Sequence, residues 1–354
     1  MPGRTLRPSH NPGWLATGGE PGYFVESASH SMSSTLILAH ADVRRLLDMA
    51  LAMEAVEEAF RALGEGRARM PAKVYLELPE FAGDFRAMPA RLGEVAGVKW
   101  VNAHPRNPER YGLPTVLATY VLNDAATALP LAVMDATLLT AYRTGAAGGV
   151  ASRYLARPGF ARVGFIGCGV QARMLLAAHR TLGTFEVLAA DRDRRAAEAL
   201  ARDAGGRVVS AEEAAGCDVV CVATPSTTPV VQRAWIRPGT HVNAMGADAP
   251  GKQELDPQIL LDAHLVVDDL PQSFHGGECN VPAAAGLLTA DHVAATLGEV
   301  VAGRKPGRAG DEITVFDSTG LAVQDVALAR ALYERARARG VGTEIELVEA
   351  APRR

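Results

Sequence analysis

The 354-residue sequence is poor in cysteine, and this scarcity excludes a disulfide-stabilised scaffold. Its cysteines are Cys168, Cys217, Cys221 and Cys279. Cys217 and Cys221 have the spacing C-x3-C, but Cys221 lies inside an apolar run, so we interpret both as buried thiols rather than zinc ligands. The sequence therefore predicts a reducing compartment and a cytoplasmic location.

Other absences exclude further classes of protein. No apolar run reaches the roughly 18 residues that a membrane span requires, so we expect no membrane partner. Lys and Arg are dispersed and the formal net charge is −4, so no nucleic-acid partner is expected either. The nine histidines form no metal-ligand pattern, and we expect no metal. Residues 1–31 lack periodicity and the apolar core of a signal peptide, which predicts a disordered N-terminal extension, and residues 346–354 are expected to be a tail.

The chain does contain enough apolar material for two domains, since 48% of its residues are hydrophobic. Residues 32–140 are strand-rich around one helix expected at 42–64, an α+β pattern. From residue 162, apolar strands alternate with helices, which predicts a parallel sheet covered on both faces. The strands of that sheet are expected at 162–166, 186–190, 218–223, 241–245 and 265–268.

The chain after this stretch is expected to form a helix at 291–303, a strand at 313–316 and a long helix to about residue 339. We expect residues 310–345 to rejoin the first domain. The sequence thus predicts an α/β protein in which a Rossmann domain, residues 141–309, is inserted into an α+β domain made of residues 32–140 and 310–345.

A glycine-rich turn gives the strongest local signal. Gly167–Ala172 has the form G-x-G-x-x-A, follows an apolar strand and begins a helix. Gly167 allows the tight turn, and Gly169 lets a pyrophosphate approach the main chain at the helix N-terminus. Asp191, after the next strand, favours NAD over NADP because its charge repels a 2′-phosphate. Arg192 and Arg194 argue the other way, since either can pair with that phosphate.

Four basic residues are candidates for chemistry: Lys73, Arg86, Lys99 and Arg143. For Lys73 and Arg86 the alternative is an ordinary exposed side chain at a strand end. Lys99 lies among apolar residues of a strand, so it must reach solvent or have an anionic partner. Arg143 begins a glycine-rich helical segment, 144–149, whose small residues allow close packing, and it would suit a carboxylate or a phosphate.

Three polar loops complete the candidates. Asp248 follows a parallel strand, at the sheet edge where ligands of open α/β folds bind, although it could also form a simple turn. Residues 317–320 are expected to cap the last helix. Residues 275–278 (HGGE) look exposed.

The sequence resembles the ornithine cyclodeaminase/mu-crystallin family over residues 35–345. Within that family it looks most like the archaeal-type alanine dehydrogenases, through Met70–Tyr75, Phe85–Ala90 and Gly246–Leu255. The remaining matching motifs are Lys99–Asn102, Gly112–Val116, Pro130–Thr137, Arg143–Ala147, Gly167–Ala172 and Val315–Gly320. The resemblance implies a substrate-binding and dimerisation domain with an inserted Rossmann domain, and a homodimer.

The resemblance also implies residue roles. Lys73, Arg86 and Lys99 would line the substrate pocket with Thr319, and Arg143 would contact both substrate and cofactor. Either Asp248 or Lys73 would be the general base. The residues expected to contact the cofactor NAD are Thr115, Arg143, Gly167, Gly169, Val170, Gln171, Asp191, Thr224, Met245, Gly246, Ala247, Lys252 and Ser318.

The implied reaction is reversible oxidative deamination of L-alanine to pyruvate and ammonia, with hydride transfer to NAD and hydrolysis of the imine. Cyclodeamination of ornithine and reduction of a cyclic ketimine are alternatives, because both would use nearly the same residues. A non-catalytic, crystallin-like role in binding NAD(P)H is disfavoured, since the catalytic set is complete.

Overall fold

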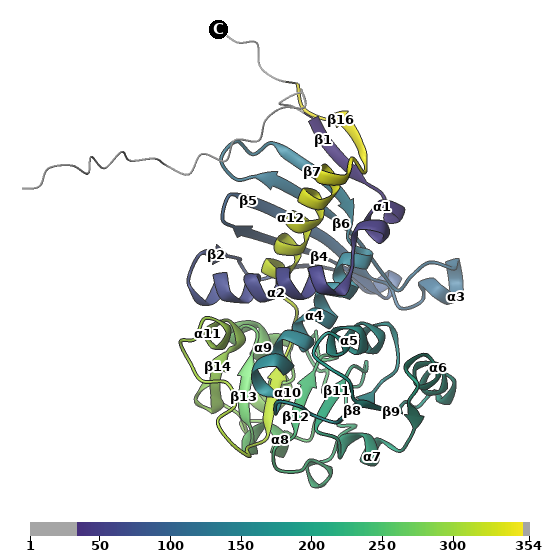
Figure 1. Ribbon diagram of the computed structural model, residues 1–354, viewed down its shortest axis with the longest axis vertical. Coiled ribbons are helices and arrows are strands. Elements are labelled where there is room, and N and C mark those ends of the chain that lie inside the picture. The colour runs from purple at the N-terminus through teal and green to yellow at the C-terminus, as the bar shows by residue number, and fades with distance from the viewer. Residues whose placement is uncertain (1–33, 350–354) are drawn as a thin grey trace, which may run out of the picture. The chain divides into compact units, whose positions relative to one another are not determined.

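Two eight-stranded sheets organise the protein, of which this computed structural model describes residues 34–349 (Figure 1). The first sheet has the order β16-β1-β7-β6-β5-β4-β2, with β3 paired to β4. Only β1 and β7 run parallel in it. Its strands are β1 (Ser34–Leu38), β2 (Ala68–Arg69), β3 (Val74–Leu78), β4 (Gly83–Leu92), β5 (Val95–Ala103), β6 (Val116–Asp124), β7 (Pro130–Asp135) and β16 (Thr343–Glu346).

The second sheet is parallel throughout and has the order β10-β9-β8-β11-β12-β15-β13-β14. This doubly wound arrangement, with helices on both faces, is the expected Rossmann-type α/β fold. Its strands are β8 (Arg162–Ile166), β9 (Glu186–Ala190), β10 (Arg207–Val208), β11 (Val219–Val222), β12 (His241–Ala244), β13 (His264–Val267), β14 (Val293–Thr296) and β15 (Thr314–Asp317).

The helices follow the same order along the chain. They are α1 (His40–Leu46), α2 (Met49–Gly64), α3 (Asn107–Tyr111), α4 (Thr137–Leu155), α5 (Val170–Arg180), α6 (Arg194–Ala204), α7 (Ala211–Ala215), α8 (Pro257–Asp262), α9 (Leu270–Gly276), α10 (Asn280–Ala284), α11 (Leu297–Val301) and α12 (Ala322–Arg339), with short 3-10 turns at Pro79–Phe81, Arg233–Trp235 and Ala290–His292. Within residues 34–349, none of them is both long enough and apolar enough to span a membrane.

Two helices connect the sheets and position the site. Helix α12 lies along one face of the first sheet, against β4, β5 and β6, and also packs on α2 and α4 (Figure 1). Helix α4 packs closely on α5, as its glycines predict. A Cβ on Gly145 would lie 2.5 Å from the main chain of Met174, and one on Gly148 would lie 2.4 Å from the Leu175 side chain. Any larger residue would therefore push α4 away from the helix that begins the dinucleotide motif.

Several expected boundaries were wrong. The helix expected at 42–64 is divided in two, because Asp48 caps α2 by accepting from the Leu51 N–H at 2.8 Å. The segment expected as one helix at 291–303 contains strand β14 and then α11. Thr296 starts α11 through a capping box with Glu299, in which the Thr296 N–H donates to the carboxylate at 2.8 Å.

The strand expected at 313–316 does not return to the first sheet. As β15 it pairs in parallel with both β12 and β13, because its apolar side chains are buried on both faces in the second sheet. Only the later part of 310–345 returns, as α12 and β16. The described residues form one compact unit, so the division into domains stays a prediction. The expected N-terminal extension, 1–31, and most of the tail, 346–354, lie outside the described residues.

Candidate active site

The glycine-rich turn lies between β8 and α5, as expected. Gly167 has φ +85°, which favours glycine, and a Cβ there would lie 2.5 Å from the Ala223 carbonyl oxygen. A Cβ on Gly169 would meet no atom within 4 Å, so there is open space in front of the α5 N-terminus. Asp191 lies beside the turn, and its carboxylate accepts from the Cys168 N–H at 2.6 Å.

A buried charge cluster joins the first sheet, α4 and α12. Lys99 on β5 is fully buried, and its ammonium donates to Asp325 of α12 at 2.9 Å. This is the anionic partner that its apolar surroundings require. Arg143 on α4 donates to the same carboxylate through Nε at 3.2 Å and to Gln324 through Nη1 at 3.3 Å. Arg143 and Lys99 therefore share one carboxylate, and when Lys99 is protonated one positive charge is left uncompensated by the described residues of this cluster.

Arg86 and Asp248 form an ion pair between the two sheet regions. The guanidinium of Arg86, on β4, contacts the Asp248 carboxylate at 3.1 Å and Asp84 at 2.8 Å. Lys252 donates to the other oxygen of Asp248. Burial would raise the pKa of Asp248, but Lys252 and Arg86 outweigh burial and lower that pKa to about 2. Asp248 is therefore ionised at neutral pH and is a weak base.

Lys73 precedes β3 and reaches across to the loop after β15. Its Nζ donates to the Thr319 carbonyl oxygen at 2.6 Å. Burial lowers the pKa of Lys73 to about 8, with Arg143 and Arg86 acting in the same direction and Asp268 and Asp248 opposing it. An amine with this pKa exchanges its proton near neutral pH.

Four fully buried carboxylates support these loops: Glu254, Asp268, Glu278 and Asp317. Glu278 and Asp317 belong to polar loops that the sequence singled out, but none of the four was predicted to have this role. Glu254 accepts from the main-chain N–H groups of Thr224 at 2.5 Å and Gly246 at 2.7 Å, and so joins the loops after β11 and β12. Glu278 accepts from the Leu255 N–H at 2.7 Å. Burial raises the pKa of Glu254 to about 6. These acids hold the loops that carry Thr224, Ser318 and the cofactor-contact candidates between Met245 and Lys252.

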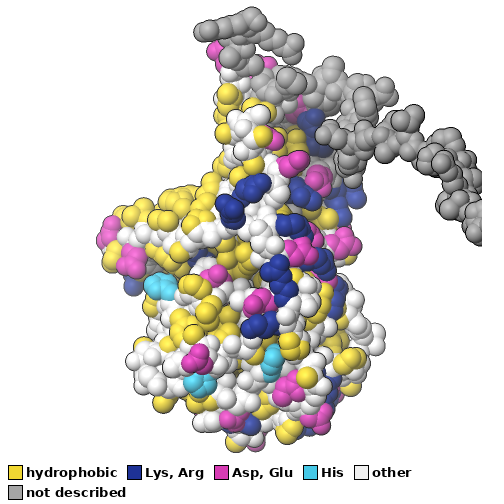
Figure 2. All heavy atoms as spheres, turned by 90° about the vertical axis from the view of Figure 1, so that its left-hand side faces the viewer, with side chains coloured by type: hydrophobic (Ala, Val, Ile, Leu, Met, Phe, Trp, Pro, Cys, Tyr) yellow, Lys and Arg dark blue, Asp and Glu magenta, His cyan; other side chains and the backbone are white. Residues whose placement is uncertain are grey.

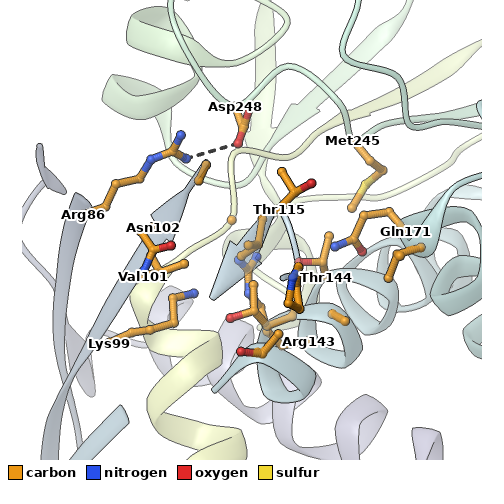
Figure 3. Close-up of a pocket in the computed structure, with 18 of the residues that line it drawn as sticks. Arg86, Lys99, Val101, Asn102, Thr115, Arg143, Thr144, Gln171, Met245 and Asp248 are labelled. Carbon is orange, nitrogen blue, oxygen red and sulfur yellow. Dashed lines mark hydrogen bonds and ion pairs between the residues drawn. The ribbon is translucent and has the colours of Figure 1, made fainter. Parts of the chain in front are cut away.

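A cavity of about 650 Å³ lies among these groups (Figure 3). Arg86, Lys99 and Asp248 lie toward one side of it, whereas Gln171 and Met245 lie toward the other. Twelve of the residues predicted for substrate or cofactor line this cavity: Lys73, Arg86, Lys99, Thr115, Arg143, Gly169, Val170, Gln171, Met245, Asp248, Ser318 and Thr319.

The other predicted residues do not line the cavity. Gly167, Asp191, Thr224, Gly246, Ala247 and Lys252 belong to the adjoining loops. A second cavity of about 380 Å³ shares Lys73, Asp248 and Thr319 with the first. Residues 275–278 were expected to be exposed, which is wrong for Glu278. Its carboxylate is buried because it accepts a hydrogen bond from the main-chain N–H of Leu255, in the loop before α8. Residues 317–320 do not cap α12, whose N-cap is Leu321.

The residues present fit a dinucleotide. Open space at Gly169, the unpaired N–H groups of the α5 N-terminus and a carboxylate at Asp191 occur in the order that the motif predicts. Gln171 and Thr140 also line the cavity. Within residues 34–349, the buried Gln171 Oε1 and Thr140 Oγ1 have no hydrogen-bond partner, so both are available to a ligand.

Fold and site together define a Rossmann-type dinucleotide-binding protein with a cation-lined cavity beside the cofactor motif. A family model described as "Ornithine cyclodeaminase/mu-crystallin family" matches residues 33–340, and the chain belongs to this family. Alanine dehydrogenase of Archaeoglobus fulgidus is 53% identical over 319 residues, which are 88% of this chain and 98% of that protein.

Solved structures agree with this assignment. An archaeal alanine dehydrogenase dimer with bound NAD is similar at a TM-score of 0.86 and 53% identity, over 89% of this chain and 100% of that one. Delta(1)-pyrroline-2-carboxylate reductase of Thermococcus litoralis, in complex with NADH and L-proline, is similar at a TM-score of 0.83 and 38% identity, over 88% and 100%. The expected family and fold are thereby confirmed.

Proposed function

We propose that this protein is an NAD-dependent amino-acid dehydrogenase that reversibly converts L-alanine and water to pyruvate and ammonia. The observation that carries the proposal is the cavity itself, where an amine with a lowered pKa, Lys73, lies beside a cation cluster with unbalanced charge. The 53% identity to an archaeal alanine dehydrogenase supports alanine over other substrates.

The substrate carboxylate is assigned to the cationic side of the cavity. Lys99 and Arg143 share only Asp325, so an anion that reaches Arg143 meets positive charge that no neighbouring acid of this cluster neutralises. Arg86 is less suited to this role, because Asp84 and Asp248 already occupy its guanidinium. A monocarboxylate therefore fits the charge of the site.

Lys73 is the better candidate for the general base. Its pKa of about 8 lets it accept a proton near neutral pH, whereas the pKa of Asp248, about 2, makes that carboxylate a poor acceptor. In the oxidative direction Lys73 takes the proton of the substrate ammonium. NAD, when bound, would supply the hydride acceptor for the substrate Cα. Lys73 releases the first proton to solvent, takes a second from the water that adds to the imine carbon and gives it to the nitrogen. The nitrogen leaves as ammonia, which takes up the hydroxyl proton as the carbonyl of pyruvate forms.

The test is NADH oxidation with pyruvate and ammonium, together with NAD reduction by L-alanine. We expect kcat/KM for alanine oxidation to rise with pH until about 8, because only neutral Lys73 accepts a proton. Lys73→Ala should lower turnover by about 100- to 10,000-fold, the usual contribution of a general base, while NADH affinity changes little. The exposed Lys305→Ala is the matched control. Unchanged turnover in Lys73→Ala would remove Lys73 from the mechanism.

Reduction of a cyclic imino acid is a second candidate, favoured by the similarity to the proline-bound reductase. The same assay distinguishes the two reactions when Delta(1)-pyrroline-2-carboxylate replaces pyruvate and ammonium. NADH oxidation with the cyclic imine, but not with pyruvate and ammonium, would replace the alanine proposal with this one.

We further propose that the protein is a homodimer formed through the first sheet. Large apolar side chains are exposed in and near β3, β5 and α3. Figure 2 shows that hydrophobic side chains also gather on part of the surface seen from the left-hand side of Figure 1. They include Val74, Leu76, Phe81, Trp100, Tyr111 and Leu113. Such a patch is typical of a protein interface.

Sedimentation of two leucine variants tests this surface. Leu76→Asp changes a side chain of β3 that is 53% exposed, and Leu287→Asp changes one in the second-sheet region that is 52% exposed. We expect Leu76→Asp to favour the monomer and Leu287→Asp to sediment as the unmodified protein does. Equal behaviour of both variants would contradict a dimer through β3.

A further inference from the structure

Asp268 occupies a position that links the second sheet to both cationic groups of the site. It directly follows β13 and is fully buried. Its carboxylate accepts from the N–H of Thr319 at 2.6 Å, the N–H of Gly320 at 2.8 Å and the Thr319 hydroxyl at 3.0 Å. Within the described residues no cation lies within ion-pair distance of it.

The segment that Asp268 holds is in turn the support of Lys73 and Arg143. The Thr319 carbonyl oxygen accepts from Lys73 Nζ at 2.6 Å. Gly320 lies so close to the guanidinium of Arg143 that a Cβ would be 2.3 Å from Nη1. Displacing this two-residue segment would therefore move both groups that face the substrate.

We propose that Asp268 is a positioning residue for the reaction, which fixes the Thr319–Gly320 segment under Lys73 and Arg143 and supplies negative charge that faces the Lys73 ammonium. This inference rests on the proposed role of Lys73 as the base. It assigns a function to a residue that touches neither substrate nor cofactor.

The electrostatics agree with this geometry. Lys73 is faced by Asp268 and Asp248, which raise its pKa, and by Arg143 and Arg86, which lower it. Asp268 opposes the effect of burial more than Asp248 does. Burial raises the pKa of Asp268 itself to about 6, while Lys73 and the Thr319 and Gly320 hydrogen bonds oppose that rise. The next buried acid, Asp317, adjoins Asp268 and has its pKa raised to about 7 by burial. At a pH between about 6 and 7, Asp268 is therefore mostly ionised whereas Asp317 is mostly protonated. The negative charge of Asp268 then favours the protonated form of Lys73.

Two substitutions separate charge from position. Asp268→Asn keeps an oxygen that can accept from the Thr319 and Gly320 N–H groups, but it removes the charge. Asp268→Ala removes both. Glu278→Gln is the matched control, because Glu278 is an equally buried acid that holds main-chain N–H groups, those of Glu254 and Leu255, and does not face Lys73.

The first readout does not depend on activity. An amine-acylating reagent is applied to the NAD-free protein across a pH series, and modification of Lys73, which reacts only as the neutral amine, is followed by peptide mass spectrometry. Loss of a facing charge lowers a lysine pKa by about one unit or more, so labelling of Asp268→Asn near pH ~7 should be about fivefold faster. The pH profile of alanine oxidation is the second readout, and its rise should move to lower pH in the same variant.

The outcomes distinguish this inference from the proposed function. Faster labelling of Asp268→Asn, with unchanged labelling of Glu278→Gln, supports the positioning role even if alanine is not the substrate. Where alanine is turned over, a rise in KM in Asp268→Ala but not in Asp268→Asn supports it further. Unchanged labelling in Asp268→Asn, or an equal change in Glu278→Gln, would overturn it.

Discussion

Gly320→Ala is expected to damage both stability and substrate recognition, and the second effect sets it apart from a glycine replaced in open space. Gly320 has φ +76°, a backbone conformation that costs an alanine about 1–2 kcal/mol. The smaller conformational entropy of the unfolded alanine chain returns about 0.4–1 kcal/mol. The backbone terms alone therefore lower the free energy of unfolding by about 1 kcal/mol.

The functional cost comes from the new methyl group. Its carbon would lie 2.3 Å from Arg143 Nη1, whereas nonbonded atoms need roughly 3.5 Å, so the guanidinium must move by about 1 Å. That movement breaks the contact of Arg143 with Gln324, now 3.3 Å, and shifts the group assigned to the substrate carboxylate. A hydrogen bond to a charged group contributes about 1.5–3 kcal/mol, so kcat/KM for alanine should fall by about 10- to 100-fold.

The control for this prediction is Gly340→Ala, at the end of α12. Gly340 also has positive φ, +61°, but a Cβ there would have no neighbour within 4 Å. Urea unfolding should show the backbone loss of about 1 kcal/mol in Gly340→Ala and a larger loss in Gly320→Ala, where Arg143 also loses Gln324. Steady-state kinetics should show the loss of kcat/KM only in Gly320→Ala. Equal kinetics in the two variants would refute the assigned contact between Gly320, Arg143 and the substrate.

Two further predictions concern the buried ion pair and the cofactor. Lys99→Met should lower the free energy of unfolding, measured by urea titration, by about 3 kcal/mol. This value is at the low end for a broken buried ion pair, because Arg143 still faces Asp325. The exposed Lys305→Met should change the same free energy by less than about 0.5 kcal/mol. Burial and Arg143 lower the pKa of Lys99 from about 10.4 in the unfolded chain to about 7 in the folded protein. Between these pH values the unfolded chain binds more protons, so the free energy of unfolding should rise with pH. The rise should be less steep in Lys99→Met. Asp191→Ser should raise the NADP to NAD ratio of kcat/KM by about tenfold or more, since it removes the charge that repels a 2′-phosphate; an unchanged ratio would contradict that role.

What the sequence could predict was mostly local. The strand, glycine turn and helix around Gly167–Ala172 follow one another within the chain, and so does the loop that carries Asp248 after β12. The parallel sheet was likewise visible, because strands such as β8 and β11 carry apolar residues on both faces. Two missed boundaries also had local signals, namely the cap at Asp48 and the capping box that begins at Thr296.

What the sequence could not predict depends on contacts between distant residues. Asp325 lies 226 positions from Lys99, and the sequence of α12 gave no reason to select it over Glu334, the other acid of that helix. Asp268 and Glu254 look like ordinary loop acids until the loops that they hold are folded around them. The sequence also could not predict which sheet contains β15, because its residues fit either sheet. Pairing with β12 and β13 places β15 in the second sheet.

The charges of the site are divided between the two sheet regions. Lys73, Arg86 and Lys99 come from the first-sheet region, whereas Asp248 and Asp268 follow strands of the second. The bonds that cross between them include Arg86 to Asp248 at 3.1 Å and Lys73 to Thr319 at 2.6 Å. Moving the regions apart would break the Arg86–Asp248 ion pair and the hydrogen bond of Lys73 to Thr319, which is costly for partly buried groups. The same interactions that set the protonation of Lys73 and Asp248 therefore also hold the cavity together.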